Sequence, residues 1–79
     1  MQTKNLATSK FRLQVVLGKA VDVRAAKAFI VKRYGAEDVT TVFGSNQNTL
    51  SLSARPGNLS SLHRYFQKKR GVQTVQISK

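Results

Sequence analysis

The stretch Thr49–Gly71, TLSLSARPGNLSSLHRYFQKKRG, decides the fold, because its hydrophobic period changes from two residues to between three and four. Its first part alternates apolar with small polar residues, which predicts a strand over Thr49–Arg55. Pro56-Gly57 then marks a turn. After it, Asn58 is an N-cap type of residue and Gly71 suits the end of a helix. The apolar positions behind both patterns are Leu50, Leu52, Ala54, Leu59, Leu62 and Phe66.

A second helix is predicted upstream, over Val23–Tyr34. Asp22 precedes it as an N-cap residue, and Gly35 follows it where a left-handed residue commonly ends a helix. Basic residues occupy the side opposite the apolar stripe. The stripe consists of Val23, Ala26, Ile30 and Tyr34, with Phe29 beside it.

Three more segments alternate with period two and predict strands over Phe11–Leu17, Val39–Gly44 and Val72–Ser78. The order is therefore β-α-β-β-α-β, which is typical of the ferredoxin-like α+β sandwich. Right-handed crossovers give a four-stranded antiparallel sheet of order 4-1-3-2, with both helices on one face. We expect a single domain over 10–79, preceded by a flexible basic arm over 1–9.

The same alternation assigns side chains to the two faces of the sheet. The phenylalanines Phe11, Phe29, Phe43 and Phe66 fit core positions. Tyr34 and Tyr65 lie at the margins of the helix stripes, so a stacking or interface role stays open for both. The face away from the helices is predicted to be open and lined by Arg12, Gln14, Thr49, Ser51, Ser53, Arg55, Thr74 and Gln76.

Charge is the strongest functional signal of the composition. Fourteen Lys and Arg oppose three acids, which gives a formal net charge of +11. Such an excess indicates a negatively charged partner, either a nucleic acid or an acidic protein. The chain has no Cys, and its single histidine, His63, has no carboxylate or second base at catalytic or metal-ligand spacing. We therefore expect a non-enzymatic module with no cofactor and no metal, located in the cytoplasm and not in a membrane.

The predicted topology gathers the basic residues at two ends of the sheet. One end would hold Lys10, Arg12, Lys32, Arg33, Arg55 and Lys79, partly offset by Glu37 and Asp38. The other end would hold Lys19, Lys68, Lys69 and Arg70. Two such rims could follow a phosphate backbone across the open sheet. On this hypothesis, charge reversal at Arg12 and Arg55 weakens binding more than reversal at Arg64 and Lys68.

An open sheet of this topology resembles the RNA-recognition motif fold, which stacks bases on aromatic residues of its two central strands. The corresponding positions here are not aromatic: they are Arg12, Gln14, Thr49, Ser51 and Ser53. If nucleic acid binds, we therefore expect contacts mainly to the backbone, with little sequence readout.

The alternative is a basic adaptor, linker or inhibitor that docks on an acidic protein. The segment Asn48–Ile77 has a strand, Pro56, a helix, Gly71 and a final strand, and in this order it resembles the basic linker domains of phycobilisomes. That resemblance implies insertion into an acidic protein assembly. A phage-type binder of a host factor is an equal possibility. The free edges of the second and fourth strands also allow homo-oligomerisation.

Overall fold

The computed structural model describes residues 10–78, so the predicted basic arm over 1–9 and Lys79 lie outside the described residues. The strands and helices follow one another in the predicted βαββαβ order. Their bounds are β1 Phe11–Gly18, α2 Val23–Tyr34, β2 Glu37–Phe43, β3 Gln47–Ala54, α3 Pro56–Lys68 and β4 Val72–Ser78.

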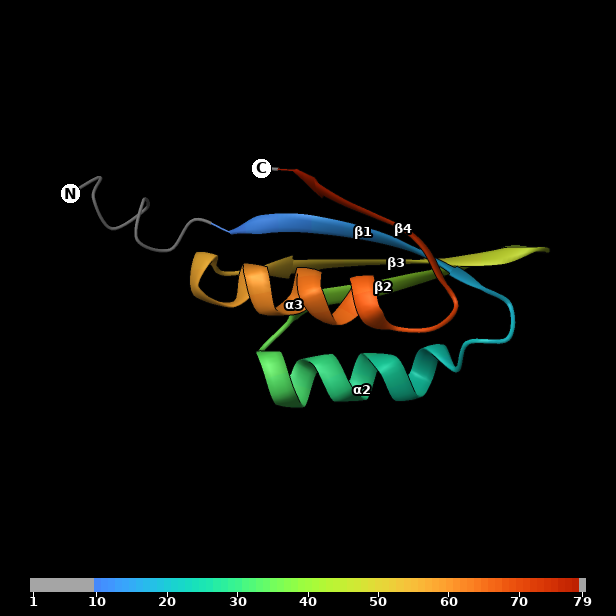
Figure 1. Cartoon of the computed structure of the whole chain (residues 1–79), viewed down its shortest axis with the longest axis horizontal. Coiled ribbons are helices and arrows are strands. Elements are labelled where there is room, and N and C mark those ends of the chain that lie inside the picture. The colour runs from blue at the N-terminus through green and yellow to red at the C-terminus, as the bar shows by residue number, and fades with distance from the viewer. Residues whose placement is uncertain (1–9, 79) are drawn as a thin grey trace.

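The four strands form one antiparallel sheet of order β2-β3-β1-β4. This is the predicted order 4-1-3-2, read from the opposite edge. Both helices lie on one side of the sheet (Figure 1). The ferredoxin-like α+β fold predicted from the sequence is therefore confirmed.

Helix α2 has the bounds that its flanking residues predict. The Asp22 carboxylate accepts a hydrogen bond from the Ala25 amide at 3.1 Å, which caps the first turn. At the other end, Gly35 adopts φ +67°, and its amide donates to the Val31 carbonyl at 3.1 Å. A left-handed glycine thus ends the helix, because no Cβ opposes this conformation.

Helix α3 corrects the predicted start. It begins at Pro56 with Arg55 in the N-cap position, and Asn58 lies inside the first turn, where it caps nothing. Proline suits the first helical position, because its φ is already helical and its missing N–H has no partner there anyway. Of the three basic residues before Gly71, Lys68 ends the helix, Lys69 is the C-cap and Arg70 follows it.

Strand β2 begins at Glu37, two residues earlier than predicted. Glu37 opposes Ser53 and Thr40 opposes Ser51, so the strand has one extra residue between these pairs. Asp38 lies in this bulge with φ +50°, a conformation that Asp tolerates better than most residues. The bulge keeps Glu37 on the open face of the sheet, opposite Ser53.

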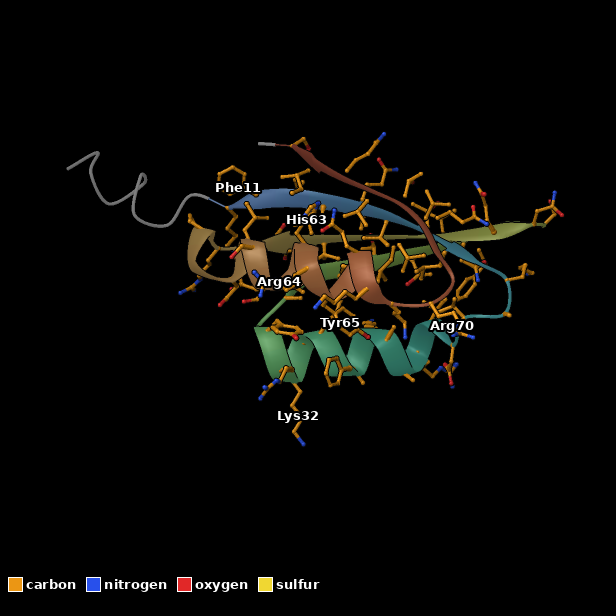
Figure 2. The ribbon with its side chains drawn as sticks, viewed as in Figure 1. Phe11, Lys32, His63, Arg64, Tyr65 and Arg70 are labelled. Atoms are coloured by element: carbon orange, nitrogen blue, oxygen red, sulfur yellow. The ribbon has the colours of Figure 1, made fainter. Side chains whose placement is uncertain are left out.

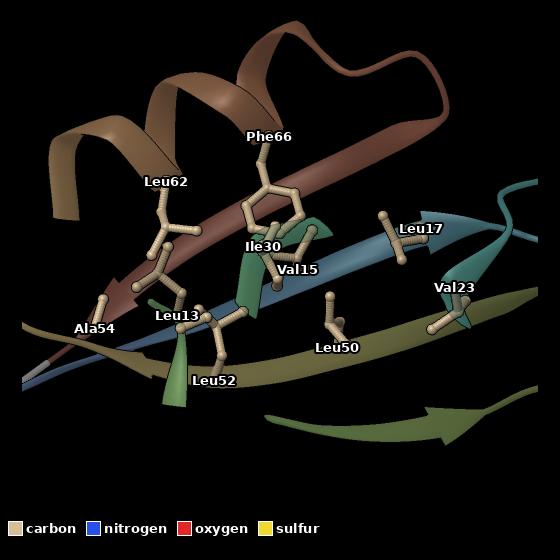
Figure 3. Close-up of a cluster of buried hydrophobic side chains, with 11 residues drawn as sticks. Leu13, Val15, Leu17, Val23, Ile30, Leu50, Leu52, Ala54, Leu62 and Phe66 are labelled. Atoms are coloured by element: carbon tan, nitrogen blue, oxygen red, sulfur yellow. The ribbon is translucent and has the colours of Figure 1, made fainter. Parts of the chain in front are cut away.

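The core lies between the sheet and the two helices (Figure 3). Phe66 is fully buried, as predicted, but the prediction was wrong for Phe29, which is 45% exposed, and for Phe43, which is 70% exposed. Phe43 ends β2 near the tip of the β2–β3 hairpin, which reaches past both helices (Figure 1). Phe11 is half-buried. The other large, fully buried side chains are Leu13, Val15, Leu17, Ile30, Leu50, Leu52 and Leu62.

Two loops meet at the end of the sheet where β1 finishes. The Gly18 amide donates to the Gly71 carbonyl at 2.8 Å, which ties the end of β1 to the turn before β4. Gly71 adopts φ +93°, and a Cβ at this position would lie 2.4 Å from a methyl carbon of Val21. The Lys19 ammonium donates to the Gly44 carbonyl at 3.1 Å and links the β1–α2 loop to the hairpin.

Candidate functional site

Three of the predicted binding residues lie on the open face at the end where β1 begins, and two of these are paired with an acid. Glu37 accepts from the Lys10 ammonium at 2.5 Å and from the Arg55 Nε at 3.2 Å. Lys10 also lies 4.0 Å from Asp38. The hydrogen bond from Lys10, helped by the charge of Arg55, lowers the pKa of Glu37 although desolvation opposes the shift. The positive charge of this rim is thus largely compensated by the protein itself.

Arg12 is the third of these residues, and it also lies on the open face as predicted. Its guanidinium donates to the Ser53 hydroxyl at 3.0 Å. A shallow depression of about 520 Å³ surrounds it, lined by Gln14, Ser51 and Gln76 among others. The open face therefore offers neutral hydrogen-bonding groups around one arginine, and no aromatic side chain lines this depression.

The helix layer carries a much larger unbalanced charge. The sequence has no Asp or Glu between residues 23 and 34 or between residues 56 and 70. Figure 2 shows Lys32 extending from α2 away from the sheet, so the predicted rim does not include it. Eight basic residues lie in these two ranges: Arg24, Lys27, Lys32, Arg33, Arg64, Lys68, Lys69 and Arg70.

A groove of about 840 Å³ runs along α3 and reaches Tyr34 at the end of α2. We call it the helix groove. Its walls combine cations, hydroxyl groups and aromatic rings, and no acid lines it. Its lining consists of the basic residues Arg64, Lys68, Lys69 and Arg70, the hydroxyl residues Ser60 and Ser61, and the tyrosines Tyr34 and Tyr65.

Three aromatic rings from the two helices meet beside this groove, and we call them the aromatic triad. Tyr65 points from α3 toward α2 (Figure 2). The Phe29 ring stacks on it with centroids 5.1 Å apart and planes 28° apart. Tyr34 completes the triad, with its centroid 5.9 Å from that of Phe29 and 5.7 Å from that of Tyr65. The Lys69 ammonium lies 5.7 Å from the Tyr65 centroid, within reach of a cation–π interaction.

The structure thus divides the predicted binding residues between two layers. Lys68, Lys69 and Arg70 come together in the helix groove, where Arg64 joins them. Arg64 is not among the binding residues that the sequence predicts. Its signal is the four-residue spacing from Lys68, which places both side chains on one side of a helix. Lys32 and Arg33 occupy the last turn of α2.

No group of three or more His, Asp or Glu side chains that could hold a metal ion occurs among residues 10–78. Within the same residues, neither helix is long and apolar enough to cross a membrane. Comparison with protein-family models, with curated proteins and with solved structures found no match for this chain.

Proposed function

We propose that this protein is a non-enzymatic module that binds nucleic acid through the phosphate backbone, with the helix groove as the centre of contact. The observation that carries this proposal is the set of eight basic residues on the helix layer, which no acid in the same ranges offsets. The proposed contacts are the groove residues Arg64, Lys68, Lys69 and Arg70, together with Lys32 and Arg33 of α2.

Like charges at this density oppose folding. Arg64 and Lys68 are four residues apart on one helix, and a like-charge pair at this spacing destabilises an isolated helix by about 0.2–0.5 kcal/mol. A phosphate chain removes this repulsion when it binds, and it releases its condensed counterions as well. The open sheet supports the proposal less, because Glu37 already pairs with Lys10 and Arg55 there, and Asp38 lies 4.0 Å from Lys10. We therefore expect reversal at Arg64 and Lys68 to weaken binding more than reversal at Arg12 and Arg55, the opposite of the order that the sequence favoured.

The test is the fluorescence anisotropy of a short labelled oligonucleotide, titrated with the protein over a series of NaCl concentrations. If the four groove cations each contact one phosphate of a single strand, the plot of log K against log salt has a slope of about −2.8 or steeper. Failure to bind at low salt, or a flat salt dependence, would refute the proposal.

A second candidate is the adaptor that docks on an acidic protein. The observation in its favour is the β2–β3 hairpin, where Val42 is 66% and Phe43 is 70% exposed. Phosphate contacts make no use of these apolar side chains, whereas a protein interface commonly contains them. Two results together would favour this candidate. The protein would bind an acidic protein but no oligonucleotide, and Val42→Ser and Phe43→Ser would each abolish that binding. Light scattering at several concentrations tests homo-oligomerisation through the edge strands β2 and β4.

A further inference from the structure

We infer that the preferred ligand of the helix groove is a single-stranded nucleic acid, one of whose bases stacks on the aromatic triad. This inference rests on the proposed function and adds the strandedness of the ligand and the residue that detects it. It combines the groove cations, which attract phosphates of any nucleic acid, with the exposed ring of Phe29, which accepts only an unpaired base.

The triad offers a ring surface that the core does not use. Phe29 stacks on Tyr65 with one of its faces, yet 45% of the residue stays exposed. A side chain so placed presents the rest of its ring to solvent. An exposed aromatic face accepts an unpaired base, and base–aromatic stacking tolerates any base because every base has a π face.

Basic residues flank this ring on both helices. Lys32 and Arg33 lie three and four residues after Phe29, so they are its neighbours on the surface of α2. At the C-cap of α3, Lys69 lies over the Tyr65 ring on which Phe29 stacks. A strand that places a base on Phe29 therefore has cations within reach of its phosphates on either side.

Charge alone would favour a duplex over a single strand. A duplex has the higher charge density, and it yields a steeper salt dependence for each contact than a single strand does. The bases of a duplex are already stacked on one another, so they are not free to stack on Phe29. Tighter binding of a single strand than of a duplex, at equal salt and equal numbers of phosphates, would thus require contacts to bases.

The chain contains its own probe for this contact. It has two tyrosines and no tryptophan, and both tyrosines belong to the triad. Intrinsic fluorescence therefore reports on the triad directly. The experiment titrates the unmodified protein with a single-stranded oligonucleotide, with an abasic strand of equal length, and with a duplex of half that length, which carries about the same number of phosphates. Free tyrosine in the same solutions corrects for absorption by the nucleic acid.

We expect the base-bearing strand to quench the tyrosine emission and to bind more tightly than both the duplex and the abasic strand. Phe29→Leu keeps an apolar side chain but removes the flat ring. It should weaken binding of the base-bearing strand by about five-fold to 160-fold, a range that corresponds to the loss of one stacked base. Affinity for the abasic strand should not change. Val31→Ala is the matched control, because Val31 is also an exposed apolar residue of α2 but lies about 160° around the helix from Phe29. This variant should bind like the unmodified protein.

The outcomes separate the two proposals. If all three ligands bind equally well and none changes the emission, stacking is refuted while backbone binding stands. If none binds at low salt, both proposals are refuted. Should Phe29→Leu fail to fold, the comparison of the three ligands with the unmodified protein still decides.

Discussion

Replacing Arg64 and Lys68 with glutamine removes two of the four cations that line the helix groove. Both side chains are exposed, so the fold should tolerate the change within about 0.5 kcal/mol. If each contacts one phosphate of a single strand, the slope of log K against log salt becomes shallower by about 1.4. The electrostatic contribution to the affinity vanishes near 1 M salt. A slope change of about 1.4 therefore corresponds to about 25-fold weaker binding at 0.1 M salt and about five-fold weaker binding at 0.3 M salt.

The matched control removes the same charge from the far side of α2. A helix turns by about 100° per residue, so Lys27 projects about 160° and Arg24 about 140° away from Phe29. The double variant Arg24→Gln/Lys27→Gln loses two positive charges as well, but it leaves the groove intact. We expect its slope to stay within about 0.3 of the value for the unmodified protein.

Fluorescence anisotropy over a series of NaCl concentrations measures both slopes, and circular dichroism checks that each variant is folded. Equal losses in the two double variants would show that net charge alone matters, which would refute a defined contact surface. A larger loss in the control would move the contact to the outer side of α2.

Three further predictions concern stability. Gly71→Ala should destabilise the protein by about 1–3 kcal/mol in urea titrations, because φ is +93° there and the new methyl group would clash with Val21; a change below the error of the measurement would contradict this account. Phe66→Ala should cost about 3–5 kcal/mol, since Phe66 is fully buried, whereas Val42→Ala, at a position 66% exposed, should change stability by less than about 0.5 kcal/mol. Because the folded state lowers the pKa of Glu37, its ion pairs stabilise the fold at pH values above the ordinary pKa of 4.5, and this stabilisation is lost as pH falls through the lower pKa of the folded state. Glu37→Gln should remove this part of the pH dependence of the urea midpoint. An unchanged pH profile would show that the ion pairs contribute nothing.

The extent to which the sequence predicts the fold can be followed at particular residues. Asp22 and Gly35 define α2 correctly, because a cap and a left-handed glycine act locally and need no tertiary contact. The predicted start of α3 was wrong, because Asn58 and Pro56 are both helix-start signals and lie close together. The helix begins at Pro56, with Asn58 inside its first turn. Glu37 joins β2 through a bulge at Asp38, and period-two alternation alone gives no sign of an extra residue.

The candidate site was less predictable than the fold. The aromatic triad depends on how α2 and α3 pack against each other, since Tyr65 meets Phe29 and Tyr34 across the interface. Hydrophobic periodicity places each ring relative to its own helix and carries no information about the neighbouring one. It therefore assigned Phe29 to the core. For the open face, the sequence did predict that Glu37 and Asp38 partly offset the charge of Lys10 and Arg55, but it did not predict the individual ion pairs.

The pairing of Glu37 with two cations also makes the charge distribution of the molecule asymmetric. The ends and face of the sheet hold few uncompensated charges, whereas the helix layer holds most of the excess. In the field of a polyanion, such a body turns its helices inward and its strands outward. A nucleic-acid strand coated with this protein would thus expose to solvent a weakly charged surface of hydroxyl and amide groups.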